Sequence, residues 1–392
     1  MAEVPESVVI VGGGLAGAKT AEVLRERGYE GAVTLLAAED ELPYERPPLS
    51  KGYLMGKDGF DKAVVHPQEW YAERDVDLRL GTEVTAIDRD AHEVELGDGT
   101  RVPYGVLVLA TGSEPRALDI PGAKPLTLRT HADADRIKAT FGEGKRLLVV
   151  GGGWIGLEVA AAAREAGTDV TLVEGAEQPL LGVLGPEMGK VFADLHREHG
   201  VDLRLGSTDL SGIEADAVLV GVGVRPRTEL AEAAGLEVDN GVLVDSSLRT
   251  SDPDIYAVGD IANHDHPVLG RRIRVEHWAT ALNQPAAAAA AILGEDAAYD
   301  RLPYFFSDQY DLGMEYVGHA TREDTARVVV RGDVDKREFV AFWLDDQDRI
   351  LAAMNVNVWD VPDEVRPLIV DRTVVDPDKL ADPDTAYSDV GR

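Results

Sequence analysis

The sequence predicts an α/β protein that contains two similar domains followed by an α+β domain. A glycine-rich turn follows a short apolar strand at Gly12 and again at Gly151, and each turn leads through a helical run into a second strand. After Pro303 the pattern changes, and the later segments are typical of antiparallel strands. At roughly 150 residues per domain, 392 residues correspond to about two to three domains.

The two similar segments share one order of parts: an apolar strand, a GxGxxG turn, an amphipathic helix and a second strand that ends in a carboxylate. In the first copy these parts are residues 8–11, 12–17, the run to Gly28, and 32–37 followed by Glu39 and Asp40; in the second they are residues 147–150, 151–156, the run to Gly167, and 169–173 followed by Glu174.

This motif has a specific physical meaning. The first glycine permits a sharp turn, the second lets a pyrophosphate approach the backbone, and the third lets helix and strand pack closely. Amides at the helix start bind phosphate, and the carboxylate accepts hydrogen bonds from ribose hydroxyls. The sequence therefore predicts two Rossmann-like dinucleotide sites, formed by Gly12, Gly14, Leu15, Ala16, Gly17 and Glu39, and by Gly151, Gly153, Trp154, Ile155, Gly156 and Glu174. The alternative is two glycine-rich turns in an ordinary α/β protein.

Two dinucleotides in one chain are expected to react with each other, and FAD with a nicotinamide cofactor is the simplest pair. Two small-residue turns after buried strands support this interpretation. Ala110, Thr111 and Gly112 are expected at the FAD site, and Gly221, Val222 and Gly223 at the NAD site. Asp260 follows a further strand and is placed to bind a polyol such as the ribityl chain; alternatively it caps the next helix.

Composition excludes several classes. With 39 basic and 71 acidic residues the net charge is −32, which argues against nucleic-acid binding and against attachment to anionic membranes. The absence of cysteine excludes disulfides, cysteine-ligated clusters and a catalytic thiol, and fits a cytoplasmic protein. The longest run without charge, residues 277–294, contains Asn283, Gln284 and Pro285 and does not predict a membrane span. His264 and His266 form an HxH pair without an evident third ligand, so a solvated loop and no metal are expected.

Three further segments carry a family resemblance: residues 43–51, 275–278 and 307–310. With these, essentially the whole chain resembles the FAD-dependent, NADH-linked ferredoxin reductases of the putidaredoxin reductase and rubredoxin reductase type, which serve cytochrome P450s and Rieske-type dioxygenases. The resemblance implies a discontinuous FAD-binding domain (1–112 and 242–310), an inserted NAD-binding domain (113–241) and a C-terminal α+β domain (311–392). It also implies hydride transfer from NADH to FAD and single-electron transfer to a ferredoxin.

The resemblance implies that Lys51 lies beside flavin N5 and pairs with Glu158. The alternatives are a solvated loop lysine and an acid that favours a helix dipole. Arg46 is expected along the FAD, at its adenosine end or pyrophosphate, or else in a surface salt bridge. Glu276, His277 and Trp278 precede an alanine-rich helix whose N-terminus is expected at flavin O2, with plain core packing the alternative for Trp278.

Two residues bear on specificity. Glu174 predicts NADH over NADPH, because a carboxylate binds the ribose 2′-hydroxyl and residues 175–178 offer no Arg or Lys for a 2′-phosphate. Phe306 stands where the family often has Trp just before Ser-Asp-Gln; it keeps an apolar wall but lacks the indole N–H.

A ferredoxin is normally acidic, so docking on this acidic chain needs a local basic or apolar patch. Arg271, Arg272 and Arg274 are the candidate patch, with a charged hairpin face the alternative. A disulfide reductase is excluded by the lack of cysteine, and no anchor for a membrane quinone reductase is evident. A redox sensor of the apoptosis-inducing-factor type, or an NADH dehydrogenase with another acceptor, shares the same motifs. Residues 376–392 are acidic, contain two prolines and are expected to form a loose tail.

Overall fold

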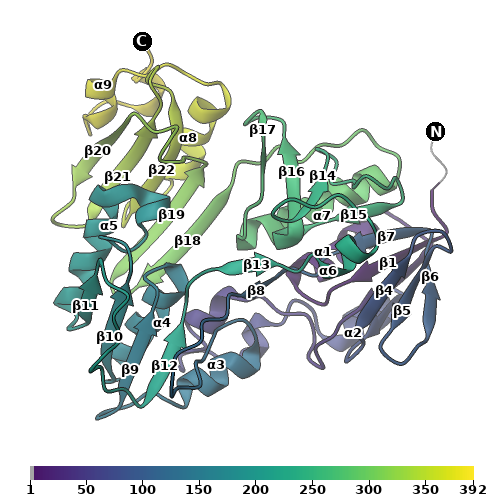
Figure 1. Cartoon of the computed structure of the whole chain (residues 1–392). Helices are drawn as coiled ribbons and strands as arrows, with labels where there is room; N and C mark the ends of the chain where they lie inside the picture. Colours follow the sequence, from purple (N-terminus) through teal and green to yellow (C-terminus); the bar gives the residue numbers. More distant parts are fainter. Residues whose placement is uncertain (1–3) are drawn as a thin grey trace. The chain divides into compact units, whose positions relative to one another are not determined.

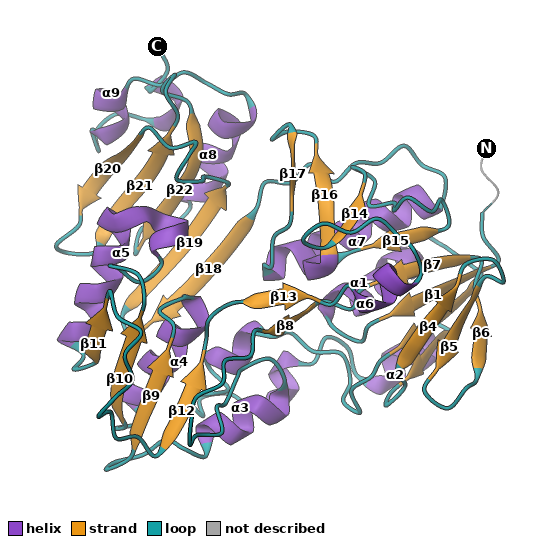
Figure 2. Cartoon of the chain, viewed as in Figure 1, coloured by secondary structure: helices purple, strands orange, loops and turns teal. Residues whose placement is uncertain are grey.

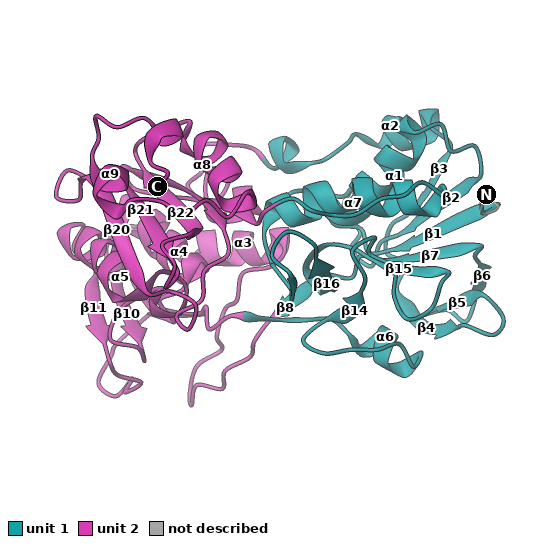
Figure 3. Ribbon diagram, turned by 90° about the horizontal axis from the view of Figure 1, so that it is seen from above, with its two compact units in different colours: residues 1–46, 60–114, 224–301 teal, residues 47–59, 115–223, 302–392 magenta. Residues whose placement is uncertain are grey.

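The computed structural model describes residues 4–392, which form two compact units (Figure 3). Each unit is assembled from separate chain segments. Unit 1 contains the residues up to Arg46, Phe60–Glu114 and Val224–Arg301, and unit 2 contains Pro47–Gly59, Pro115–Gly223 and Leu302–Arg392. A short two-stranded ribbon, β8 (Ser113–Pro115) with β13 (Val224–Pro226), lies where the chain passes from one unit to the other and back.

The centre of unit 1 is a five-stranded parallel sheet. Its order is β15 (Ile255–Ala257), β7 (Val106–Leu109), β1 (Ser7–Val11), β2 (Ala32–Leu36) and β3 (Val76–Arg79). In Figure 1 the purple β1 and the green β15 belong to this one sheet although they are far apart in sequence. All four residues of β7 are buried, as expected for a strand that is covered on both faces.

The other elements of unit 1 surround this sheet. Its helices are α1 (Leu15–Glu26), α2 (Gln68–Glu73), α6 (Glu229–Ala233) and α7 (Trp278–Ile292), and its 3₁₀ turns are η2 (Phe60–Ala63) and η3 (Gly259–Ile261). One small antiparallel sheet contains β4 (Val84–Asp88), β5 (Glu93–Leu96) and β6 (Arg101–Pro103). A second small sheet contains β14 (Val242–Val244), β16 (Ala262–His266) and β17 (Arg271–Ile273). Helix α1 packs against α7, which contains the predicted alanine-rich run.

Unit 2 repeats the first half of this plan with a four-stranded parallel sheet. Its order is β11 (Asp202–Leu205), β10 (Asp169–Glu174), β9 (Arg146–Val150) and β12 (Ala217–Val220). The unit also contains the 3₁₀ turn η1 (Pro47–Ser50), α3 (His131–Lys138), α4 (Trp154–Glu165) and α5 (Leu181–Glu198), which is interrupted at Gly185 before Pro186. The predicted repeat is confirmed: β1, α1 and β2 correspond to β9, α4 and β10.

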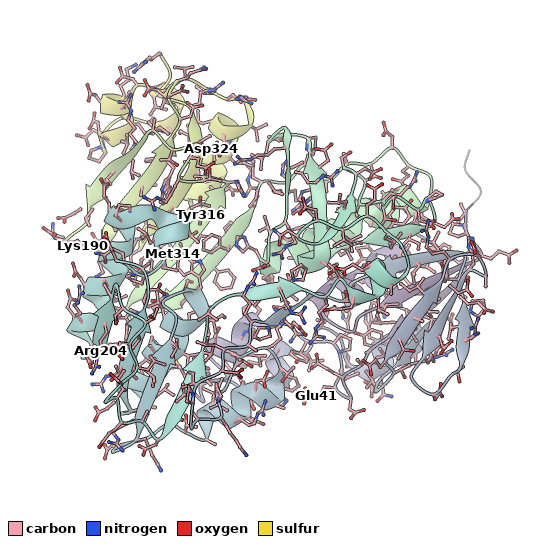
Figure 4. All side chains as sticks on the ribbon, viewed as in Figure 1. Glu41, Lys190, Arg204, Met314, Tyr316 and Asp324 are labelled. Atoms are coloured by element: carbon pink, nitrogen blue, oxygen red, sulfur yellow. The ribbon has the colours of Figure 1, made fainter. Side chains whose placement is uncertain are left out.

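A five-stranded antiparallel sheet completes unit 2. Its order is β18 (Tyr304–Gln309), β19 (Leu312–Gly318), β22 (Ile350–Val356), β21 (Glu338–Leu344) and β20 (Arg327–Asp333). Figure 2 shows this sheet with α8 (Val361–Val370) and α9 (Pro377–Ala381), which contact β22 and β20. Met314 and Tyr316 of β19, labelled in Figure 4, are buried in its core. The predicted C-terminal α+β region is confirmed.

Several sequence expectations differ from the structure. The expected boundary at residue 311 falls inside the C-terminal sheet, because β18 pairs with β19 along its length from Tyr304. Residues 224–241 were expected in the NAD-binding domain and belong to unit 1, whereas residues 47–59 were expected in the FAD-binding domain and belong to unit 2. Residues 376–392 do not form a loose tail: they contain α9 and the 3₁₀ turn η4 (Tyr387–Asp389), and Leu380 and Val390 are fully buried.

The structural setting of the HxH pair also differs from the expectation. His264 and His266 lie in strand β16 and are 1% and 0% exposed, so they do not belong to a solvated loop. Burial lowers the pKa of His264 to about 4, which keeps its ring neutral at ordinary pH. Across residues 4–392, no group of three or more potential ligands among His, Cys, Asp and Glu is arranged to hold a metal ion.

Candidate active site

The first glycine-rich turn has the shape that a dinucleotide requires. Gly12 has φ +123°, and a Cβ there would lie 2.2 Å from the Ala110 carbonyl oxygen. A Cβ at Gly17 would lie 2.0 Å from the Gly12 carbonyl oxygen, whereas a Cβ at Gly14 would meet no atom within 4 Å. The outer glycines are therefore needed for packing, and the middle one faces open space where a pyrophosphate can approach the backbone.

The second turn repeats this geometry. A Cβ at Gly151 would lie 2.4 Å from the Gly221 carbonyl oxygen, and one at Gly156 would lie 2.1 Å from the Gly151 carbonyl oxygen. A Cβ at Gly153 would meet only the Gly221 oxygen, at 3.8 Å. Both turns thus close against the strand end that carries the expected small residues: Ala110 at the first turn and Gly221 at the second.

The helices that follow the turns begin without side-chain caps. Gly14 is the N-cap of α1 and Gly153 that of α4, and neither helix has an acidic residue in its first turn. Leu15 and Trp154 are the first helical residues, followed by Ala16 and Ile155. The first amides of a helix have no partner within it, so both helix starts offer donors and a positive dipole end to a phosphate.

The two acids after the second strands are held differently. Glu174 accepts hydrogen bonds from the backbone amides of Gly152 (2.6 Å) and Ala176 (2.7 Å). Glu39 accepts from the Tyr44 hydroxyl (2.6 Å) and forms an ion pair with Arg46 (3.2 Å). Arg46 thus makes a salt bridge, its side chain remains 30% exposed, and its contact with the FAD stays a prediction.

Asp260 lies beside the first turn. It is the middle residue of η3, and its carboxylate accepts from Ser113 Oγ at 2.7 Å. The preceding residue, Gly259, has φ +78°, and a Cβ there would lie 3.0 Å from the Ala16 side chain. The N-cap of η3 is Val258, so capping does not explain Asp260. Its position fits a polyol site next to α1.

The start of α7 is ordered by contacts within unit 1. Trp278 is the first residue of the helix and donates from Nε1 to Glu45 (3.0 Å), so it is not a plain core residue. Burial raises the pKa of Glu45, whereas the bond from Trp278 opposes that shift. His277 is the N-cap and gives no side-chain cap, and Glu276 pairs with Arg274. As at α1 and α4, no acidic residue occupies the first turn.

A buried ion pair lies in unit 2. Lys51 Nζ is 2.8 Å from Glu158 Oε1, and the two side chains are 14% and 4% exposed. Glu158 also accepts from Ser50 Oγ (2.5 Å) and Ser307 Oγ (2.7 Å). The structure thus brings together Lys51 and Glu158, as the resemblance implied. It adds two serines that the sequence reasoning did not assign, although both lie in the motifs at 43–51 and 307–310.

Aromatic side chains adjoin this pair. Lys51 Nζ lies over the Phe306 ring, 5.3 Å from its centroid. Trp154, at the start of α4, packs edge-on against Phe305 with ring centroids 5.1 Å apart. Burial raises the pKa of Asp308, which neighbours Lys51 and Glu158. The Phe306 position therefore keeps an apolar ring next to the lysine.

The small-residue turns and the arginine cluster complete the predicted set. Gly112 and Gly223 have positive φ (71° and 96°), and Val222 is 38% exposed. Arg272 donates to the carbonyl oxygens of Val244 and Asn263 within unit 1. The side chain of Arg274 is only 7% exposed. Arg274 is therefore a structural residue and presents little surface to a partner.

Two family models match the chain. The model described as pyridine nucleotide-disulphide oxidoreductase matches residues 6–285, and the model described as reductase C-terminal matches residues 304–390. No helix among residues 4–392 combines the length and the hydropathy needed to cross a membrane.

Relatives and solved structures match over almost the whole chain. The ferredoxin–NAD(+) reductase component of the anthranilate 1,2-dioxygenase system of Burkholderia cepacia is 44% identical, covering 96% of this chain and 97% of its own. Putidaredoxin reductase of Pseudomonas putida is 40% identical (96% and 94% covered). The crystal structure of the covalent putidaredoxin reductase–putidaredoxin complex matches with a TM-score of 0.92, at 38% identity and 98% coverage of both chains.

The matched ranges include both glycine turns and the C-terminal sheet. The chain belongs to the pyridine nucleotide-disulphide oxidoreductase family, among its ferredoxin–NAD(+) reductases of the putidaredoxin reductase type.

Proposed function

We propose that this chain is an FAD-dependent NADH:ferredoxin reductase that supplies electrons to an oxygenase of the cytochrome P450 or Rieske dioxygenase type. The observation that carries the proposal is the buried Lys51–Glu158 pair, which lies in the same unit as the second dinucleotide turn. A buried ion pair stabilises a fold little on its own, so its presence next to a nucleotide turn favours a functional role.

Unit 1 holds the features that fit FAD. The uncapped start of α1 presents amides to the pyrophosphate, and Gly14 leaves space for it. Asp260, held by Ser113, is placed for the ribityl hydroxyls. Glu39 is the acid for the adenosine ribose, with Arg46 and Tyr44 orienting it. The start of α7 would stabilise negative charge near flavin O2. When bound, FAD accepts a hydride from NADH and passes electrons on one at a time.

Unit 2 holds the features that fit NADH as the substrate. The start of α4 binds its pyrophosphate, and Glu174 accepts from the ribose hydroxyls. Two backbone amides fix the Glu174 carboxylate, so it cannot easily swing aside for a 2′-phosphate. Discrimination against NADPH follows from this fixed negative charge.

The lysine acts by position and charge. The family resemblance implies a position for Lys51 beside flavin N5, and Glu158 with its serine donors would hold the ammonium in one orientation. A fixed cation there favours negative charge on the reduced ring system and helps to seat the nicotinamide. Hydride transfer requires alignment of donor and acceptor and no proton carrier, so Lys51 and Glu158 would act by orientation and charge.

The electron acceptor is a small ferredoxin. Arg271 and Arg272 of β17 are the proposed docking residues, whereas Arg274 is withdrawn from that role because its side chain is buried. The cysteine-free composition fits a cytoplasmic setting.

An anaerobic titration tests the proposal. Purified protein with its flavin is titrated with NADH, and then with NADPH, while the visible spectrum is recorded. Bleaching by about one NADH per chain, followed by rapid single-electron reduction of an added [2Fe–2S] ferredoxin, is expected. Flavin that NADH reduces but that passes electrons poorly would instead indicate a redox sensor, and a preference for NADPH would refute the role of Glu174.

A further inference from the structure

A buried chain of hydrogen bonds extends from the Lys51–Glu158 pair to helix α5. Ser307 Oγ is 2.7 Å from Glu158 Oε1, and Gln309 Nε2 is 3.2 Å from Ser307 Oγ. Gln309 Oε1 is in turn 2.9 Å from His196 Nε2. Ser307 and Gln309 are 1% exposed and His196 is 0% exposed. All of these residues belong to unit 2, and they come from four separate parts of the sequence.

With His196 in place, the donors of this hydrogen-bond chain all point toward Glu158. A carboxylate only accepts, so the Ser307 hydroxyl donates to Glu158. The Ser307 oxygen then accepts from the amide nitrogen of Gln309, which leaves the amide oxygen of Gln309 facing His196. His196 must therefore carry its proton on Nε2 and donate it to Gln309.

The far side of His196 agrees with this tautomer. The Tyr310 hydroxyl lies 3.4 Å from His196 Nδ1 and can donate to it. Burial lowers the pKa of His196 to about 4, so the ring is neutral and has a single N–H. The ring of Tyr310 stacks on His199, with centroids 3.7 Å apart, which holds the hydroxyl in place.

We propose that His196 is a positioning residue for the Lys51–Glu158 pair, and that it acts by fixing the direction of the Gln309–Ser307 hydrogen bonds that end on Glu158. The inference rests on the proposed function, in which Lys51 lies beside the reacting flavin. It assigns a role to a residue that never contacts substrate or cofactor.

His196 determines which way the side-chain amide of Gln309 points. Without the His196 donor, the amide can reverse so that its oxygen faces Ser307. The Ser307 hydroxyl would then donate to Gln309 and turn a lone pair toward Glu158. Glu158 would lose one of its donors and would be repelled by the serine oxygen, so the orientation of Lys51 would no longer be fixed.

Two substitutions of His196, with side chains of similar length, separate loss of the hydrogen-bond donor from loss of packing. In His196→Gln, the side-chain amide can place a nitrogen donor where Nε2 of the imidazole was. In His196→Met, a side chain of similar length has no donor. We expect H196M to reduce the limiting rate of flavin reduction by NADH roughly tenfold while leaving the Kd for NADH unchanged, and H196Q to restore most of that rate.

Two readouts do not depend on turnover. The midpoint potential of the bound FAD should become more negative in H196M and stay near the unaltered value in H196Q, because a mobile Lys51 stabilises the reduced flavin less. In ¹⁵N NMR of the unaltered protein, His196 should be the Nε2–H tautomer. His266→Met is the matched control: it removes another fully buried histidine, in unit 1, and should lower stability without shifting the potential.

The outcomes distinguish the two proposals. If NADH fails to reduce the flavin of the unaltered protein, the proposed function is refuted, whereas the NMR tautomer still tests the hydrogen-bond direction. Equal behaviour of H196M and H196Q, or an Nδ1–H tautomer, refutes the positioning role alone. If both variants unfold, Ser307→Ala and Gln309→Met provide the second test. Each should slow flavin reduction, and the double variant should be no slower than S307A alone.

Discussion

The repeated glycine turn allows nucleotide binding to be separated from folding by single methyl groups. In the second copy, a Cβ at position 153 would meet only the Gly221 carbonyl oxygen, at 3.8 Å, which is ordinary contact. Gly153 has φ −79° and ψ 179°, a conformation that alanine adopts freely. A Cβ at position 156 would lie 2.1 Å from the Gly151 carbonyl oxygen. Gly153→Ala should therefore leave the stability of the fold unchanged, whereas Gly156→Ala should lower it.

The magnitudes follow from these distances. For G156A, overpacking against a backbone oxygen costs about 3 kcal/mol, and the higher helix propensity of alanine offsets about 1 kcal/mol of it. A net loss of about 2 kcal/mol corresponds to a melting temperature lower by roughly 4–8 °C. For G153A, the methyl group keeps the pyrophosphate from the helix amides. Losing one or two charge-assisted hydrogen bonds, at about 1.5–3 kcal/mol each, raises the Kd for NADH by roughly 10-fold to 1,000-fold or more.

The assay uses the flavin as reporter. Because FAD is proposed to bind in unit 1, G153A should purify with its flavin and show an unchanged melting temperature. Stopped-flow bleaching at rising NADH concentrations then gives Kd and the limiting rate separately. Unchanged NADH affinity in G153A would contradict the role of Gly153 at the pyrophosphate. Equal melting temperatures of G156A and G153A would contradict the packing role of Gly156.

Three further outcomes are expected. Lys51→Met leaves Glu158 buried with only its serine donors, so the free energy of unfolding should fall by about 3 kcal/mol and flavin reduction should slow at least tenfold. Unchanged melting curves together with an unchanged stopped-flow rate would contradict this expectation. Val390→Ala should cost about 2 kcal/mol in urea unfolding because Val390 is fully buried, whereas a loose tail would show no effect. His196 and His264 have pKa values of about 4 against an ordinary 6.5, so the unfolded chain binds more protons below pH 6.5. Unfolding free energy should therefore fall as the pH drops from about 7 to about 5, by about 2 kcal/mol for each of these two histidines, and H196Q should remove the part that His196 contributes.

The sequence predicts the fold well where local chemistry determines it. At Gly12 and at Gly151 a strand, a glycine turn and a helix follow one another within a short segment, so both dinucleotide-binding folds could be recognised from the sequence alone. The acid at Glu174 was predictable for the same reason, since it ends the strand next to the turn.

Features that depend on contacts between distant segments could not be predicted. The pair of prolines at 377 and 383 suggested a loose tail, but Leu380 and Val390 are fully buried, and α9 contacts strand β20. His264 and His266 appeared to be loop residues because the pairing of β16 with β14 and β17 is not visible locally.

The same limit applies to the site. Lys51 and Glu158 were linked only through the family resemblance, and nothing in their spacing brings them together. Ser50 and Ser307 lie in motifs that the sequence analysis singled out, yet a serine is too common a residue to be assigned without its contact to Glu158. Arg274 shows the reverse case: an arginine in a basic run is normally exposed, but this one is enclosed by Asn240, Glu276 and the Asp260 carbonyl.

The assembly of each unit from separate segments has a consequence for biosynthesis. Strand β7 ends at Leu109, and its neighbour β15 begins at Ile255. At 5–20 residues per second a ribosome needs about 7–30 s to make the residues between them, and during that time one hydrogen-bonding edge of a wholly apolar strand has no partner. Lys51 is likewise synthesised before its ion-pair partner Glu158, and both are synthesised before Ser307, which donates to Glu158. Nascent chains of this protein should therefore recruit holding chaperones until residue 301 has emerged, and their yield in cells should depend on translation speed more than on the stability of the finished protein.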